Sequence, residues 1–275
     1  MLAAHAVYSQ SYTGDSWNYL KFKGHGEISL AYVETPSFVY KDKNQKLTGI
    51  CADIMQDFVL WVNKTKNVKL DARYVGDGSS FHSMYDHVKN SDGGVIGLGN
   101  ITITDERKKE VNFSPPIITN FAILVSNSGV PTLSKLENIS STFANMTAYT
   151  AKGTLNEKRI LNLKQKYFPD MKISYTTSSQ ETLEKIFSDP RGFAYLDLAF
   201  YLEACQLKKN IQRHPVGDNV TEKFGFIMPI NSDWMPVINE FFNANGGYLN
   251  SLAYRNILIK HLGNTGVKLL NSLAR

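Results

Sequence analysis

The sequence predicts a two-lobe α/β fold, in which each lobe is a mixed, mostly parallel sheet flanked by helices. The chain has 275 residues, which is enough for two domains of about 130 residues each. Hydrophobic residues make up 43% and charged residues 20%, as in an ordinary soluble globular protein. Short apolar runs alternate with helical patterns, and the alternation restarts midway along the chain, which predicts two blocks of strands and helices.

In the first block, apolar runs and their spacing define the elements. Ile50, Ile54 and Phe58 recur at helical spacing, so they lie on one face of a predicted helix. The predicted strands cover residues 27–34, 68–75, 94–98 and 120–125, and the predicted helices cover 49–63 and 81–89.

The second block repeats this pattern. Its predicted strands cover residues 147–150, 173–177 and 192–198, and its predicted helices cover 155–167, 180–187 and 199–205. One more predicted strand, over 224–230, comes after this block. A helical tail over 234–262, interrupted at Gly246 and Gly247, follows.

These blocks predict the domain organisation. We expect residues 26–125 and 223–275 to form the first lobe and residues 126–222 to form the second. The tail most simply packs back on the first lobe, so two crossover strands would join the lobes and form a hinge beside a cleft. Residues 1–25 would be an extension that packs on a lobe or is partly ordered.

Composition and motif content argue against several classes of function. The net charge of +5 is spread along the chain, so no nucleic-acid partner is expected. The two cysteines and six histidines match no metal-ligand spacing, and no catalytic or phosphate-binding motif is present. We therefore predict a protein that is not an enzyme and uses no metal or cofactor.

The segment 99–114, GNITITDERKKEVNFS, carries the strongest functional signal. It follows the predicted strand 94–98, so Thr102 would lie at the carboxyl end of a sheet, where open α/β sheets bind ligands. Thr104 followed by acidic residues is typical of a helix start, which places Arg107 in the first turn. An arginine there can grip a carboxylate with its planar fork, although a solvated arginine paired with a neighbouring acid is the alternative.

The stretch ITITDERKKEVNFSPPI closely resembles the TIT-x-x-R-x-x-x-V-x-F-S-x-P signature of the family 3, amino-acid-binding extracellular solute-binding proteins. These receptors serve ABC importers and are related to the ligand-binding domains of ionotropic glutamate receptors. Further matches are ETPSFVYKDKNQKLTGICADI at 34–54, AKGTLNEK at 151–158, FAYLDLAFYL at 193–202 and FGFIMPI at 224–230. The resemblance covers about residues 27–262 and implies the type II periplasmic-binding-protein fold, with a free α-amino acid bound between the lobes.

The resemblance also implies how the common groups of an amino acid are bound. Arg107 would clamp the α-carboxylate, with help from the backbone N–H groups of Thr102 and Leu155. The α-ammonium would be received by the Asn100 carbonyl, the Thr102 hydroxyl and the Asp197 carboxylate. Because Arg107 and Asp197 come from different lobes, the complete site would form only on closure. From the residues alone, Asp197 could instead be the N-cap of the following helix.

Other implied residues surround the ligand side chain. Phe81 matches the aromatic that covers the ligand, Thr154 belongs to the Gly-Thr turn of the second lobe, and Glu34 corresponds to a position beside the pocket in glutamate-receptor relatives. The available hydrophobic walls are Tyr32, Phe38, Phe81, Leu155 and Phe200, of which the first two fit the core better. No second arginine or lysine suggests itself as a partner for an acidic ligand. We therefore predict a neutral, apolar or aromatic amino acid, with a cationic ligand paired to Glu34 as the alternative.

The sequence departs from the family pattern at three places. Leu155 stands where the family usually has a hydroxyl, Cys51 stands where transport-linked members usually have Asp, and Thr35 replaces the aromatic that often precedes the proline. These departures bear on the ligand and its affinity more than on the fold.

The resemblance implies a periplasmic or extracellular monomer that delivers its ligand to the membrane permease of an ABC importer. Residues 4–6, Ala-His-Ala, are typical of a signal-peptidase site, which predicts the remnant of a removed signal peptide. Six N-x-[ST] sequons would instead fit a secreted eukaryotic receptor domain.

Two other functions remain open on the same fold. One is a ligand-sensing domain that signals through a partner. The other is a dehydratase or lyase, for which Glu34 and Asp197 are the candidate general acids.

Overall fold

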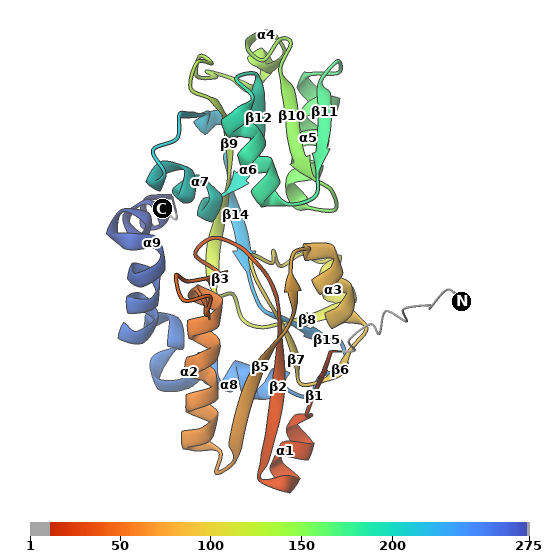
Figure 1. Ribbon diagram of the computed structural model, residues 1–275, viewed down its shortest axis with the longest axis vertical. Helices are drawn as coiled ribbons and strands as arrows, with labels where there is room; N and C mark the ends of the chain where they lie inside the picture. Colours follow the sequence, from red (N-terminus) through yellow and green to blue (C-terminus); the bar gives the residue numbers. More distant parts are fainter. Residues whose placement is uncertain (1–11, 274–275) are drawn as a thin grey trace, which may run out of the picture.

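The computed structural model describes residues 12–273 and has two lobes, which lie one above the other in Figure 1. In the first sheet the strands lie in the order β5, β2, β7, β15 and β8. Strand β2 is parallel to both of its neighbours, whereas β15 is antiparallel to both of its own. The strands of this lobe are β2 (His25–Val33), β3 (Tyr40–Lys41), β4 (Leu47–Thr48), β5 (Lys69–Gly78), β6 (Asp92–Gly93), β7 (Val95–Leu98), β8 (Val111–Phe113) and β15 (Ile227–Pro229). Its helices include α2 (Ile50–Thr65), α3 (Phe81–Lys89) and α8 (Met235–Asn243).

The second sheet has the order β11, β10, β12, β9 and β13, and β14 also pairs with β9. Strand β10 is parallel to both neighbours, while β9 is antiparallel to its partners. Its strands are β9 (Ile118–Asn127), β10 (Thr147–Ala151), β11 (Lys172–Thr176), β12 (Gly192–Asp197), β13 (Ile211–Arg213) and β14 (Asn219–Phe224). The helices of this lobe are α4 (Ile139–Thr142), α5 (Leu155–Tyr167), α6 (Ser179–Ser188) and α7 (Leu198–Gln206).

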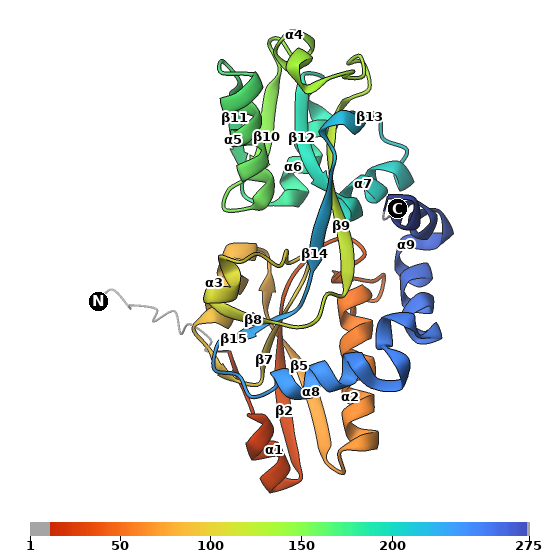
Figure 2. The same cartoon turned by 180° about the vertical axis from the view of Figure 1, so that it is seen from behind.

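Strands β9 and β14 run side by side between the lobes (Figures 1 and 2). The sequence predicts that residues 120–125 belong to the first lobe, but Ala122 to Ser126 pair with β12 of the second sheet. The apolar run is buried along its length, so its composition does not show to which sheet it belongs. Its sheet is decided by its antiparallel partners β12 and β14, which lie far away in the sequence. The predicted strand 224–230 is likewise divided, since β14 ends at Phe224 and β15 begins at Ile227 on the other sheet.

The helical tail is interrupted around Gly246 and Gly247 as predicted, but it continues beyond residue 262. After α8, two short 3₁₀ turns (Ala244–Gly246 and Tyr248–Asn250) precede α9 (Leu252–Leu273), which is kinked at Gly263 with φ of 68°. Helix α9 packs on α2 and also contacts α7 of the second lobe. The contact with α7 is close at Gly266, where an added Cβ would lie only 3.1 Å from Leu202 Cδ1. Within residues 12–273, no helix is long and apolar enough to cross a membrane.

The described part of the N-terminal extension packs on the first lobe. It forms β1 (Thr13–Gly14), which pairs with β6, and α1 (Trp17–Lys23). The Trp234 indole donates to the Asp15 carbonyl at 2.8 Å, and its ring lies 5.3 Å from that of Trp17. The candidate signal-peptide remnant at residues 4–6 lies outside the described residues.

A buried histidine anchors the core of the second lobe. His214 packs against Phe143, its Nδ1 accepts the Leu133 N–H at 3.1 Å, and its Nε2 lies 2.8 Å from the Ser126 hydroxyl. Because Nδ1 accepts a backbone N–H, the ring must be neutral with its proton on Nε2. Burial lowers the pKa of His214 to about 4.

This pKa shift predicts that the free energy of unfolding of the second lobe falls in mild acid. The neutral ring is compatible with folding above the unfolded pKa of about 6.5, and folding stability is lost as the pH falls toward 4. We expect this histidine to account for about 3 kcal/mol of the loss between these values. Urea unfolding at several pH values should show a shallower dependence for His214→Gln than for the exposed control His25→Gln. Equal slopes for the two variants would contradict the assignment.

Candidate functional site

A cavity of about 700 Å³ lies between the two lobes. It is formed where β2, β7 and β12 end, and such carboxyl edges of strands are where open α/β sheets bind ligands. All nine site residues named from the sequence line it: Glu34, Phe81, Asn100, Thr102, Arg107, Thr154, Leu155, Asp197 and Phe200. Tyr32 and Phe38 do not line it and belong to the core, as their sequence context favoured: Tyr32 packs on Tyr74, and Phe38 packs on Phe224.

Arg107 supplies a cation to the first-lobe wall. It begins a short 3₁₀ turn rather than the expected helix, and its backbone N–H donates to the Thr104 hydroxyl at 3.2 Å. Its Nη1 donates to the Thr102 carbonyl at 3.0 Å, and its guanidinium lies 4.9 Å from the Phe81 ring. No described carboxylate forms an ion pair with it, and burial lowers its pKa. A half-buried cation held on aromatic faces can bind an anionic group.

Asp197 supplies an anion from the second lobe. Its carboxylate accepts three amide donors: Asn100 at 2.5 Å on Oδ2, and Asn120 at 3.2 Å and Asn156 at 3.4 Å on Oδ1. Burial raises its pKa, although the Arg159 charge and the three amides act in the opposite direction. The residue occupies the N-cap position of α7, but its side chain makes no capping hydrogen bond.

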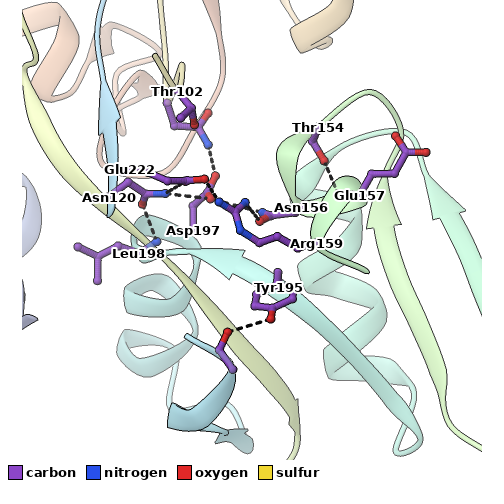
Figure 3. Close-up of polar contacts among 12 residues, drawn as sticks. Thr102, Asn120, Thr154, Asn156, Glu157, Arg159, Tyr195, Asp197, Leu198 and Glu222 are labelled. Carbon is purple, nitrogen blue, oxygen red and sulfur yellow. Dashed lines mark hydrogen bonds and ion pairs between the residues drawn. The ribbon is translucent and has the colours of Figure 1, made fainter. Parts of the chain in front are cut away.

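A second pair of charges lies beside Asp197 and was missed in the sequence. Arg159 on α5 forms an ion pair with Glu222 on β14, and the two side chains are only 13% and 8% exposed. Arg159 Nη1 also donates to the Asn156 amide oxygen at 2.8 Å, and the Asn120 amide donates to Glu222 at 3.0 Å. Both amides that reach Asp197 Oδ1 are thus positioned by this pair (Figure 3).

No motif identified this ion pair, because Arg159 and Glu222 are far apart in the sequence. The only sequence signal was the position of Asn156 and Arg159 just after the Gly-Thr turn. The expectation of no second cation was therefore wrong, since Arg159 and the exposed Lys152 both line the cavity. Glu222 nevertheless neutralises Arg159.

The turn before α5 presents the start of that helix to the cavity. Gly153 has φ of 78°, and the Thr154 hydroxyl accepts the Glu157 N–H at 3.2 Å while Glu157 accepts the Gly153 N–H at 2.7 Å. This reciprocal cap leaves the Leu155 end of the helix at the cavity, where its dipole favours an anion.

The rim and walls of the cavity complete the site. Glu34 forms an ion pair with Lys41 at 2.7 Å, and both side chains are about two-fifths exposed. Phe81, Leu155 and the buried Phe200 supply apolar surface. Among residues 12–273, no group of His, Cys, Asp or Glu side chains is arranged to hold a metal ion.

Comparison with known proteins identifies the family. The sequence profile of the bacterial extracellular solute-binding proteins, family 3, matches residues 28–244, which is most of the chain. The chain belongs to this family. The resemblance seen in the sequence is therefore confirmed. A search of curated proteins finds no significant match.

Solved structures agree with this family fold. An ancestral arginine-binding protein bound to arginine is 21% identical, with a TM-score of 0.65, and the match covers 86% of this chain and 98% of that one. The GluR0 ligand-binding core from Nostoc punctiforme in complex with (L)-glutamate is 16% identical, with a TM-score of 0.63 and coverage of 86% and 99%. The ancestral amino-acid-binding protein AncCDT-1, a precursor of cyclohexadienyl dehydratase, is 20% identical, with a TM-score of 0.63 and coverage of 89% and 98%. These similarities show the two-lobe fold.

The Arg159–Glu222 pair predicts an asymmetric response to mutation. Glu222→Gln preserves an acceptor for Asn120 but removes the ion-pair partner of the buried Arg159, which should lower the free energy of unfolding by about 3 kcal/mol. Adding Arg159→Met removes that cation and should restore most of the loss. Urea unfolding of the ligand-free protein measures both variants, and equal losses in the single and double variants would contradict the assignment.

Proposed function

We propose that the protein is a periplasmic or extracellular receptor that binds a free α-amino acid between its lobes and delivers it to an ABC-type permease. The observation that supports this proposal is that Arg107 from one lobe and Asp197 from the other both line the same cavity. An amino acid carries a carboxylate for the first and an ammonium for the second. Because each lobe holds one charge, the ligand gains both contacts only when the lobes are together, so binding favours closure.

The side-chain subsite favours a neutral, apolar or aromatic amino acid. Phe81, Leu155 and Phe200 offer apolar surface, Arg159 is already neutralised by Glu222, and Lys152 is an exposed side chain in contact with solvent. A cationic ligand is the second choice, because it would have to compete with Lys41 for Glu34. Competition among leucine, phenylalanine, arginine and glutamate tests this ranking, and a preference for glutamate would overturn both choices.

A dehydratase or lyase is the second candidate function. It is favoured by the raised pKa of Asp197, which burial causes, since a protonated carboxyl is what a general acid needs. The similarity to AncCDT-1 is compatible with it. Product formation from a prephenate- or arogenate-like substrate would support this function, whereas recovery of unchanged ligand would oppose it.

Thermal unfolding with each of the twenty amino acids tests the receptor proposal. A ligand at 1,000 times its Kd stabilises the folded protein by about 4 kcal/mol, which for a chain of this length raises Tm by roughly 10 °C. We expect one or a few amino acids to produce such a shift. Arg107→Ala should abolish it, whereas Arg255→Ala, an exposed arginine on α9, should retain it. If no amino acid shifts the wild-type Tm, the receptor proposal fails.

A further inference from the structure

Asn100 joins the two lobes directly across the cavity. It follows β7 in the first lobe, whereas Asp197 ends β12 in the second. The hydrogen bond from Asn100 Nδ2 to Asp197 Oδ2 is 2.5 Å long. The Asn100 side chain of the first lobe thus already contacts the Asp197 carboxylate, which is the group that would bind a ligand ammonium.

The Asn100 amide has a second partner on its other side. The hydroxyl of the buried Thr35 lies 3.1 Å from Asn100 Oδ1 and 3.4 Å from the Val33 carbonyl, so its one proton has two acceptors within reach. The NH₂ end of Asn100 faces Asp197, because an ionised carboxylate only accepts hydrogen bonds.

The two carboxylate oxygens of Asp197 accept hydrogen bonds from different kinds of donor. Oδ1 accepts Asn120 and Asn156, both of which are themselves fixed by the Arg159–Glu222 pair. The donor on Oδ2 comes from the opposite lobe and is a neutral amide. An ammonium bonded to a carboxylate forms a stronger, charge-assisted pair than a neutral amide does. Oδ2 is therefore the position at which a ligand can displace a protein donor.

We propose that Asn100 is a displaceable latch: its amide substitutes for the ligand ammonium on Asp197, holds the ligand-free lobes together, and is expelled when an amino acid binds. The proposal rests on the proposed function for the identity of the displacing group. The latch makes Asn100 a determinant of specificity. A carboxylate ligand without an ammonium leaves the latch bond in place, whereas an amino acid must replace it.

The ligand-free protein gives a first test that needs no ligand. Small-angle X-ray scattering should show a larger radius of gyration for Asn100→Ala than for wild type, because the bond between the lobes is lost. Asn138→Ala, an exposed asparagine of the second lobe, serves as the matched control and should leave the radius unchanged. An unchanged radius in Asn100→Ala overturns the latch, whatever the protein binds.

Binding to matched ligand pairs gives the second test. The probes are L-phenylalanine with 3-phenylpropanoate, and L-arginine with 5-guanidinopentanoate, measured by calorimetry. In Asn100→Ala the ratio of the amino acid's affinity to that of its analogue without the amino group should rise roughly tenfold over wild type. Only the amino acid displaces the hydrogen bond to Asp197, whereas the cost of bringing the lobes together is common to both ligands. An unchanged or lower ratio in Asn100→Ala would overturn the proposal.

A second variant guards against an effect on folding. Thr35→Val preserves the shape of a buried side chain but releases Asn100 Oδ1, so it should shift the radius and the affinity ratio in the same directions by a smaller amount. If wild type binds no amino acid at all, the proposed function fails, and the scattering comparison still decides the latch.

Discussion

The rest of the site depends on how one buried carboxylate, that of Asp197, is compensated. A carboxylate removed from water is costly unless donors replace its hydration. Here the donors are amides from three different parts of the molecule: Asn100 in the first lobe, Asn120 on a hinge strand and Asn156 on α5. The same anion therefore determines how the first lobe, the hinge and the second lobe lie relative to one another.

The charges around this carboxylate divide the cavity into a closed part and an open part. Arg159 and Glu222 neutralise each other and hydrogen-bond to the asparagines, so they form a polar floor of the cavity. Arg107 is held by a carbonyl and an aromatic face, neither of which neutralises its charge. The cavity thus offers a free cation on one wall and a compensated anion on the other, a combination suited to a ligand that brings both charges.

How much of the fold was predictable depended on whether an element is defined locally. Helix α2 was predicted from its apolar spacing, and Ile50, Ile54 and Phe58 are all buried as expected. Errors occurred where the chain passes between lobes, at residues 120–125 and 224–230. An apolar run there is equally compatible with either sheet, because only pairing with a distant strand decides to which sheet it belongs.

The sequence by itself determined the two-lobe α/β class, the family and the candidates Arg107 and Asp197, because apolar periodicity and a contiguous motif are local properties of a chain. Only the tertiary structure decided that Arg159 and Glu222 pair beneath the cavity, and that an asparagine of one lobe bonds to the carboxylate of the other. Those outcomes depend on contacts between residues far apart in the chain. Burial strengthens the need of a charge or an amide for a partner, but the spacing of residues along the sequence does not show which groups become buried together.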